Sequence, residues 1–284
     1  MCCGASVPEL PEIQAHAERL DRDFAKATLD RFTPLAFTAL KTASPSPDGA
    51  RGRELVFVGR RGKHLLLDFG ELTFVVHLMQ GGRLKPDAKQ SAKPRFGQAR
   101  WHFRDGRALL LTEAGTERKA GVWVVDGDPD EQAPLLGLGP EADTLDQATL
   151  ARLLKDNPMR LHGFLRDQRL VAGMGRLLAN EVCHRARLSP FANTSKLEGD
   201  DVSQLSDAIR VCIDEGLAFE RGLEEMSSSA DRPAHVHGRT GEACPECGDV
   251  VRAVEYSRYT VAYCASCQTG GKVLADNTTS KFLR

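Results

Sequence analysis

A long apolar run is missing from this sequence of 284 residues, and no stretch approaches the roughly 18–20 residues that a membrane span requires. The first residues also lack the charged and then apolar layout of a secretion signal. Internal repeats and long low-complexity tracts are absent as well. We therefore expect a cytoplasmic protein that has no membrane partner.

A strong net charge is also missing. The formal charge is −1, which argues against a protein that binds polyanions in general. The bases are nevertheless clustered in three stretches, at residues 51–63, 83–100 and 160–187, whereas acids gather at 126–131. One such cluster alone is more typical of a solvated face. The three together modestly favour a groove that binds a phosphate backbone.

Cysteine is not scarce, but its pattern argues against disulfides. Of eight cysteines, four form two Cys-x-x-Cys pairs and the others are scattered, which favours metal binding in a reducing compartment. The pairs are Cys244 with Cys247 and Cys264 with Cys267, separated by sixteen residues that could form a hairpin. Two redox dithiols are the weaker alternative. We predict that all four thiolates bind one Zn²⁺, which is structural because no coordination position stays open.

The order of the predicted elements divides the chain. An amphipathic helix at residues 10–24 precedes several short runs of β-forming residues, which are separated by glycines and by the hairpin signal Asp105-Gly106. The runs lie at residues 54–58, 63–69, 72–78, 99–103 and 122–125. Because no helices intervene, these strands predict a β-sandwich or barrel.

A polar, turn-forming linker at residues 126–143 leads to a segment, residues 144–235, that is predicted to be helical. We expect helices at about 144–157, from Pro158 onward, at 176–185 and at 200–219. Two glycines between Asp167 and Gly175 break the helical pattern. The result is a helix-turn-helix-like unit with arginines, which on its own is a weak signal for DNA binding. The zinc module occupies residues 236–284.

Five segments of the sequence carry a further signal when they are taken together. The segments are Pro8-Glu-Leu-Pro-Glu12, Arg60-Arg-Gly-Lys63 with the apolar residues after it, Leu138-Gly-Pro-Glu141, Phe164 to Gly175, and Val236 to Gln268 around the four cysteines. They resemble the Fpg/Nei family of DNA glycosylases and occur in the family's order. The resemblance spans nearly the whole chain from Pro8, and the ordered set is hard to explain otherwise.

The resemblance implies both a fold and an activity. The fold would be α+β: an N-terminal catalytic β-sandwich with a leading helix at residues 8–125, the linker at 126–143, a helix-two-turn-helix DNA-binding domain at 144–235 and a zinc finger at 236–284. The activity would be base-excision repair by a monomer that binds double-stranded DNA containing damaged bases or abasic sites. Such a glycosylase removes the base through a Schiff base to an N-terminal proline and, as a lyase, nicks the abasic site.

The same resemblance implies catalytic roles for three residues. Pro8 would supply the amine that attacks C1′ of the sugar, and an α-amine, with a pKa of about 8, is unprotonated at neutral pH more often than a lysine amine. Glu9 matches the acid/base that assists opening of the sugar ring, and Lys63 matches the lysine that contacts phosphate near the lesion. From the residues alone, Pro8 and Glu9 could equally begin a helix, and Lys63 could be a solvated strand charge.

The other implied DNA contacts lie where this sequence departs from the family pattern. Arg176 stands where an asparagine that binds a backbone phosphate is common, and arginine can hold phosphate too. Arg118 and Lys119 occupy the position of the intercalating wedge, but the following residue is Ala120, which is a poor wedge for base flipping. Arg258 resembles the phosphate-binding arginine of the zinc-finger hairpin, displaced by one residue.

The nitrogen of Pro8 is acylated by Val7 in this sequence, and a tertiary amide is not a nucleophile. A valine codon such as GTG can serve as a bacterial start and is then read as methionine, which is readily removed before proline. We therefore expect the working polypeptide to begin at Pro8.

Two other functions stay open. A catalytically impaired paralogue that binds damaged or structured DNA would account for the altered wedge, for Arg176 and for the residues that precede Pro8. A zinc-ribbon protein that acts on RNA is the third hypothesis, and it would bind duplex RNA more tightly than abasic DNA.

Overall fold

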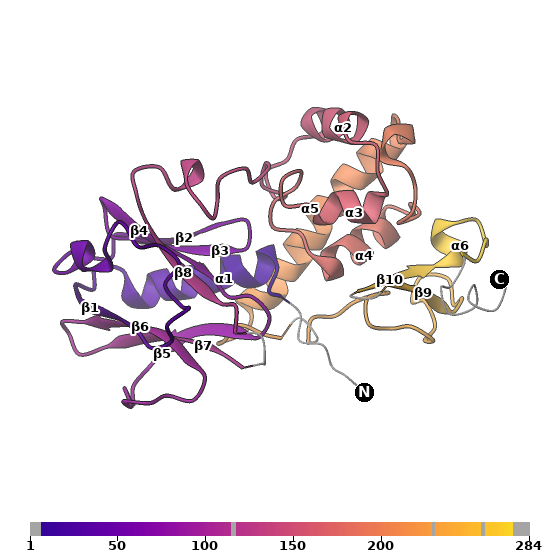
Figure 1. Ribbon diagram of the computed structural model, residues 1–284. Helices are drawn as coiled ribbons and strands as arrows, with labels where there is room; N and C mark the ends of the chain where they lie inside the picture. Colours follow the sequence, from indigo (N-terminus) through magenta and orange to yellow (C-terminus); the bar gives the residue numbers. More distant parts are fainter. Residues whose placement is uncertain (1–6, 115–117, 229–230, 257–258, 275–284) are drawn as a thin grey trace. The chain divides into compact units, whose positions relative to one another are not determined.

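The computed structural model of the chain describes residues 7–114, 118–228, 231–256 and 259–274 (Figure 1). The chain forms two compact units. The N-terminal unit comprises Met1–Leu138 and Glu220–Ala230, and the C-terminal unit comprises Gly139–Phe219 and Asp231–Arg284. Among the helices of the described residues, none is long and apolar enough to cross a membrane.

The N-terminal unit opens with helix α1 (Leu10–Phe24), which is followed by strands in two four-stranded antiparallel sheets. One sheet has the order β1-β6-β7-β5 and the other β2-β3-β4-β8. The strands are β1 (Leu29–Pro34), β2 (Phe57–Arg61), β3 (His64–Asp68), β4 (Leu72–His77), β5 (Gly82–Pro86), β6 (Gly97–Phe103), β7 (Ala108–Glu113) and β8 (Gly121–Asp126), with short 3-10 turns at Pro47–Ala50 and Pro129–Glu131.

An aromatic cluster joins the two sheets. Phe32 of β1 and Trp101 of β6 come from one sheet and Phe74 of β4 from the other, and the centroids of their rings are 4.9–5.8 Å apart. Ile13 and Leu20 of α1 belong to the same buried core. Because one apolar core lies between two sheets, the predicted β-sandwich with a leading helix is confirmed.

Several predicted boundaries in the sandwich are confirmed and others are wrong. Helix α1 has the predicted bounds, and Asp105-Gly106 does join β6 to β7 as a hairpin. Strand β2 begins at Phe57 rather than at Glu54, because the backbone of Leu55 pairs with Lys26 and Ala27 instead of with β3. The expected runs omitted β1, β5 and β7. Strands β1 and β5 are the edge strands of their sheet, whereas β7 is an inner strand.

The C-terminal unit contains the helices α2 (Gln147–Asp156), α3 (Leu161–Arg166), α4 (Arg176–Arg185) and most of α5 (Asp200–Arg221), with a 3-10 turn at Thr194–Lys196. A hairpin of β9 (Val251–Glu255) and β10 (Thr260–Cys264) then leads into the short helix α6 (Ala265–Gln268), drawn in yellow in Figure 1. Helix α4 has the predicted bounds. Helix α3 begins at Leu161 rather than near Pro158, because Met159 exchanges hydrogen bonds with Thr194.

The chain passes between the two units three times. The last turn of α5 and the residues after it belong to the N-terminal unit, where the guanidinium of Arg19 donates a 2.8 Å hydrogen bond to the Glu220 carbonyl and Arg221 pairs with Glu18. We call Glu220–Ala230 the strap. This division differs from the predicted ranges, which placed the strap with the helices and separated the zinc finger from them.

Candidate functional site

The candidate catalytic residues Pro8 and Glu9 lie at the start of α1, where both are buried. Glu9 is the N-cap residue: its carboxylate accepts the backbone N–H of Glu12, and the Glu12 carboxylate accepts the N–H of Glu9 at 2.9 Å. Pro11 stands in the first turn, where a missing N–H costs nothing. This reciprocal capping box fixes the conformation of the chain directly after Pro8.

The candidate residue Lys63 lies in the tight turn between β2 and β3, at the same end of α1. The carboxylate of Asp21 accepts the N–H of Val58, and the amide oxygen of Gln14 accepts a hydrogen bond from Arg60. Since the chain advances along β2 as it returns toward the start of α1, the turn after β2 points to the end that carries Glu9. Gly62 adopts a φ of +54° in this turn, a conformation that favours glycine.

The candidate wedge residues lie between β7 and β8. Arg118 and Lys119 are exposed, and Arg118 has a positive φ of 46°. Ala120 is fully buried, and its backbone N–H donates a 2.7 Å hydrogen bond to the carboxylate of Glu113. The alanine at this position therefore belongs to the core of the sandwich, and the exposed side chains of the loop segment 118–120 are both cationic.

Arg176 is the first residue of α4 in the C-terminal unit. It is exposed, whereas Gly175 is the N-cap residue and offers no side-chain acceptor. The turn before it is held by Gln168, whose amide donates to the carbonyl of Met174 and accepts from the N–H of Gly173. A cation and a helix N-terminus therefore lie together on a rigid turn, an arrangement that suits an anion.

Arg258 lies outside the described residues, but the two residues that flank its position on either side are held by aromatic contacts. The rings of Tyr256 and Tyr259 stack at 4.7 Å between centroids. From α3 the guanidinium of Arg166 lies 4.3 Å from the ring centroid of Tyr259, and Arg160 donates a 2.8 Å hydrogen bond to the Tyr256 hydroxyl. The hairpin is thus tied to α3 by stacked rings and arginines.

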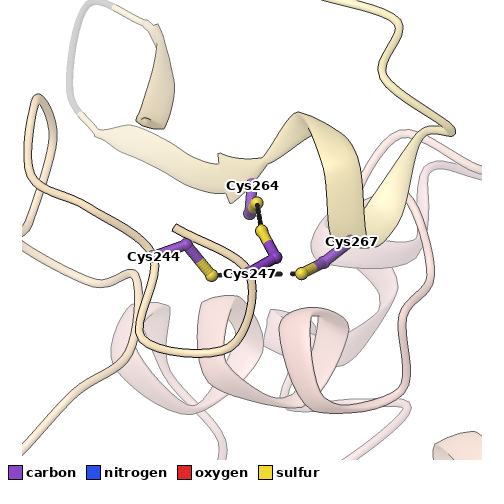
Figure 2. Close-up of side chains that lie close together, drawn as sticks. All are labelled: Cys244, Cys247, Cys264 and Cys267. Atoms are coloured by element: carbon purple, nitrogen blue, oxygen red, sulfur yellow. Dashed lines mark hydrogen bonds between the residues drawn. The ribbon is translucent and has the colours of Figure 1, made fainter. Parts of the chain in front are cut away.

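The four predicted cysteines converge (Figure 2). Their sulfur atoms all lie within 4.8 Å of one another, with 3.9 Å between Cys244 and Cys267 and 3.4 Å between Cys247 and Cys264. Zinc–sulfur bonds of about 2.3 Å in a tetrahedron place the sulfurs about 3.8 Å apart. The spacing, the number and the softness of the donors therefore fit a single zinc-sized ion.

The electrostatics of the cluster also favour a cation. Burial raises the pKa of the Cys264 and Cys267 thiols, whereas a hydrogen bond from the Asp249 backbone lowers the pKa of Cys247. Without a metal ion, burial therefore opposes the thiolate form at two of the four positions. A divalent cation would hold all four as thiolates and would hold the short hairpin together.

Helix α4 holds the segment that leads into the first cysteine pair. The carboxylate of Glu181 accepts three backbone N–H groups, from His235 at 2.7 Å, Val236 at 3.0 Å and His237 at 2.8 Å. One turn along, Nε2 of His184 lies 3.3 Å from Sγ of Cys244. From the other side, the amide of Gln268 in α6 donates to the Leu188 carbonyl that follows α4.

The sequence reasoning did not identify Glu181, His184, Tyr256 or Tyr259 as functional candidates. Glu181 pairs with residues 54–56 positions away, and His184 with a residue 60 positions away. Contacts at such separations leave no local periodicity. The one available signal was the pair of tyrosines within the strand-like interval between the cysteine pairs.

Comparisons with known proteins agree with this architecture. The family model of the formamidopyrimidine-DNA glycosylase N-terminal domain matches residues 7–122, and the model of the formamidopyrimidine-DNA glycosylase H2TH domain matches residues 136–228. A Mycobacterium tuberculosis protein described as an uncharacterized formamidopyrimidine-DNA glycosylase-like protein is 39% identical over 166 residues, which cover 56% of this chain and 99% of that protein. The formamidopyrimidine-DNA glycosylase of Shewanella amazonensis is 28% identical over 287 residues, 93% of this chain and 100% of that one.

Solved structures show the same fold. The crystal structure of the MutM (Fpg) protein from Thermus thermophilus matches with a TM-score of 0.80 and 27% identity over 94% of this chain and 100% of that one. The fold is also that of Lactococcus lactis Fpg in a complex with DNA that contains an abasic site, at a TM-score of 0.79 and 19% identity over 92% of this chain and 99% of that one. From its sandwich, its H2TH helices and these relatives, the chain belongs to the formamidopyrimidine-DNA glycosylase family, the Fpg/Nei family of the sequence resemblance.

Proposed function

We propose that this protein is a base-excision-repair DNA glycosylase that also acts as an abasic-site lyase on damaged double-stranded DNA. The observation that carries the proposal is the start of α1, where Pro8 and Glu9 are buried and locked by the capping box. The turn with Lys63 points to the same end of the helix. The start of α1 would therefore supply a nucleophile and an acid/base, and the adjoining β2–β3 turn would supply a phosphate contact, in a glycosylase-family fold.

In the proposed reaction, the secondary amine of Pro8 attacks C1′ of the damaged nucleotide. The bond from Pro8 nitrogen to C1′ forms, the glycosidic bond breaks, and the base leaves with a proton. Glu9 protonates O4′ as the ring opens, and the nitrogen loses its own proton to give the iminium, or Schiff base. The iminium acidifies the hydrogen on C2′, whose loss expels the 3′ phosphate and nicks the strand. Lys63 would hold the phosphate beside the lesion.

The remaining predicted residues would bind the DNA backbone. Arg176, together with the N-terminus of α4, would bind one phosphate. Arg118 and Lys119 would contact the DNA beside the lesion through their flexible cationic side chains. Arg258 would reach DNA from the zinc-finger hairpin, and a structural Zn²⁺ on the four cysteines would keep that hairpin folded. We propose that the protein works as a monomer.

Trapping with borohydride tests the proposal, since reduction of the iminium leaves a stable covalent adduct on an abasic-site oligonucleotide. Protein that begins at Pro8, with its N-terminus confirmed by intact mass, should form the adduct. The matched control is the chain of 284 residues, in which the Pro8 nitrogen is an amide, and it should form none. Replacement Pro8→Ala leaves a primary terminal amine and should reduce trapping strongly, because the fixed geometry of the proline ring is lost.

A second candidate is a family member that binds damaged DNA without excising a base. The buried Ala120 favours it, because the segment 118–120 then offers no apolar side chain to fill the space of a flipped nucleotide. Tight binding to abasic duplex by the Pro8-start protein, without any adduct, would support this candidate and reject the lyase. A panel of duplexes with single lesions then identifies the damaged base.

A further inference from the structure

The imidazole of His184 lies in the interior of the C-terminal unit, against one of the four cysteines. Its Nε2 atom is 3.3 Å from Sγ of Cys244, and both side chains are only 2% exposed. His184 comes from α4, whereas Cys244 comes from the loop before β9. The contact therefore joins a helix of the H2TH region to the cysteine cluster, and water cannot readily replace it.

The chemistry of a metal-bound thiolate decides the direction of this hydrogen bond. A thiolate that holds a metal ion has no proton and can only accept, so the imidazole must carry its proton on Nε2 and donate. Four thiolates around one divalent cation leave a net charge of 2−. N–H donors to the sulfurs spread this charge and make the thiolates less prone to protonation and loss of the metal.

Neighbouring residues of α4 hold the segment that leads to Cys244. Asn180, four residues earlier and so on the same face of α4, pairs through its amide with His237 at 2.8 Å. Glu181 fixes the backbone of residues 235–237. The ring of His235 packs edge-on against His184 with 5.8 Å between centroids. The segment that leads to Cys244 is therefore anchored on α4 next to the imidazole.

We propose that His184 is a positioning residue of the metal centre, which donates its Nε2 proton to the metal-bound thiolate of Cys244. Through this bond α4 supports the first cysteine pair and strengthens retention of the ion. Helix α4 thus carries Arg176 in its first turn and His184, which would support the metal centre, in its last turn. The inference rests on the metal proposed for the four cysteines, and its test separates the two.

The direct test uses the wild-type chain loaded with ¹¹³Cd²⁺ and labelled with ¹⁵N on histidine. We expect His184 to be protonated on Nε2 and that proton to couple to the cadmium nucleus through the sulfur. Cadmium bound to four thiolates, with His184 protonated on Nδ1 alone, would overturn the role of His184 and leave the metal site intact. Failure of the chain to bind cadmium at all would reject the metal site itself.

Variants loaded with Co²⁺ measure what the hydrogen bond does. His184→Phe keeps an aromatic ring but removes the donor, so the sulfur-to-cobalt charge-transfer band should shift and a chelator should remove the metal about tenfold faster. His184→Gln restores an N–H and should recover part of both effects. The matched control is His162→Phe, which replaces a buried histidine of α3 in the same unit whose ring stacks on Tyr259.

The proposal would be overturned if the charge-transfer band and the rate of metal loss were the same in wild type, His184→Phe and His162→Phe. So would equal losses in His184→Phe and His184→Gln, since a merely structural role of the ring predicts no rescue by the amide. The NMR measurement needs no substitution and decides the direction of the hydrogen bond even if His184→Phe does not fold.

Discussion

The N-terminal sandwich and the zinc-finger hairpin are stabilised in different ways. The sandwich buries a continuous apolar core that reaches from α1 through both sheets, with Phe74 and Trp101 at its centre and both fully buried. The hairpin buries a few side chains around Val251 and Ala262. It depends instead on the cysteine cluster and on polar contacts with α4. Apolar burial therefore stabilises the unit proposed to carry the chemistry, whereas the proposed metal ion and hydrogen bonds would stabilise the region proposed to contact DNA.

Loss of the metal should give the largest effect. Cys247→Ala removes an exposed proposed ligand and leaves little cavity, so its cost should be the lost binding energy of the proposed zinc, roughly 10–16 kcal/mol in isolated fingers. Hydrogen exchange followed by mass spectrometry should show residues 235–274 unprotected while the sandwich stays protected, and DNA binding should be lost. Cys212→Ala, which removes a buried thiol outside the cluster, should retain the metal. Full DNA affinity in the metal-free variant would contradict the claim that the metal stabilises the hairpin that contacts DNA.

Truncation of the core should follow in size. Trp101→Ala should destabilise the sandwich by about 3–5 kcal/mol, because it removes a fully buried aromatic that contacts both Phe32 and Phe74. Chemical denaturation measures this loss. Trp123 is only half-buried, so Trp123→Ala should cost clearly less. Both variants should keep their metal, and release of metal from Trp101→Ala would mean that the two regions are not stabilised separately.

Acid should weaken the sandwich through His16. Burial lowers the pKa of His16 from 6.5 to about 4, although the Leu84 carbonyl, which accepts from Nε2 at 2.7 Å, opposes the shift. The ring is neutral in the fold, so the unfolded chain binds more protons between these values. Stability is complete above pH 6.5 and falls as the pH drops to 4, by about 3 kcal/mol. His16→Gln should flatten this slope in urea titrations across the window, and an unchanged slope would reject the assignment.

The attachment of the hairpin to α4 should depend on Glu181. Glu181→Ala removes the acceptor of three backbone N–H groups and should cost about 2 kcal/mol. Glu181→Gln keeps an acceptor and should cost less. Hydrogen exchange at residues 235–237 reports the change directly. Glu215→Ala breaks an exposed ion pair with Arg185 and should change stability by less than about 1 kcal/mol, and equal effects of the two alanine variants would argue against this anchor.

The smallest effect on stability is expected at Arg176, where the readout is DNA binding. Arg176→Ala should leave the free energy of unfolding within about 0.5 kcal/mol. It should weaken binding to damaged and undamaged duplex alike and lower the slope of log K against log salt by about one. Arg169 is also exposed but pairs with Asp167, so Arg169→Ala is the control. A changed base preference with an unchanged salt slope would reject a phosphate contact.

Much of the fold could be predicted because its signals are local. The bounds of α1 and α4 follow from apolar periodicity and from terminal residues that lie within a few positions of one another. The cysteine cluster follows from two fixed spacings. Strands β1 and β5 were missed because edge strands bury few side chains, but the inner strand β7 was missed although its run Ala108-Leu-Leu-Leu is apolar. The start of α3 was missed because Thr194, which is distant in sequence, takes the hydrogen bonds of Met159.

Residues of the candidate site whose proposed role follows from their residue type could be predicted from the sequence. Residues that hold other residues in place could not. Pro8, Glu9 and Lys63 could be proposed from the family resemblance, and their roles stay predictions. The capping box that joins Glu9 to Glu12 could have been read from the three-residue spacing of two carboxylates before an apolar helix. The acceptor role of Glu181 and the contact of His184 with Cys244 could not be predicted from the sequence, since they depend on packing between segments more than 50 residues apart.

The strap limits how this protein can be divided, by an experimenter or by evolution. A gene fragment that stops at residue 138 encodes both sheets, but it omits the buried carboxylate of Glu220 and the core residue Met226. The guanidinium of Arg19 would then lose its hydrogen bond to the Glu220 carbonyl and its ion pair with the Glu220 carboxylate. The sandwich is thus not a portable module, because part of its interior is encoded some eighty residues downstream. Recombination that exchanges N-terminal halves between relatives must therefore preserve compatibility with a strap inherited from the other parent.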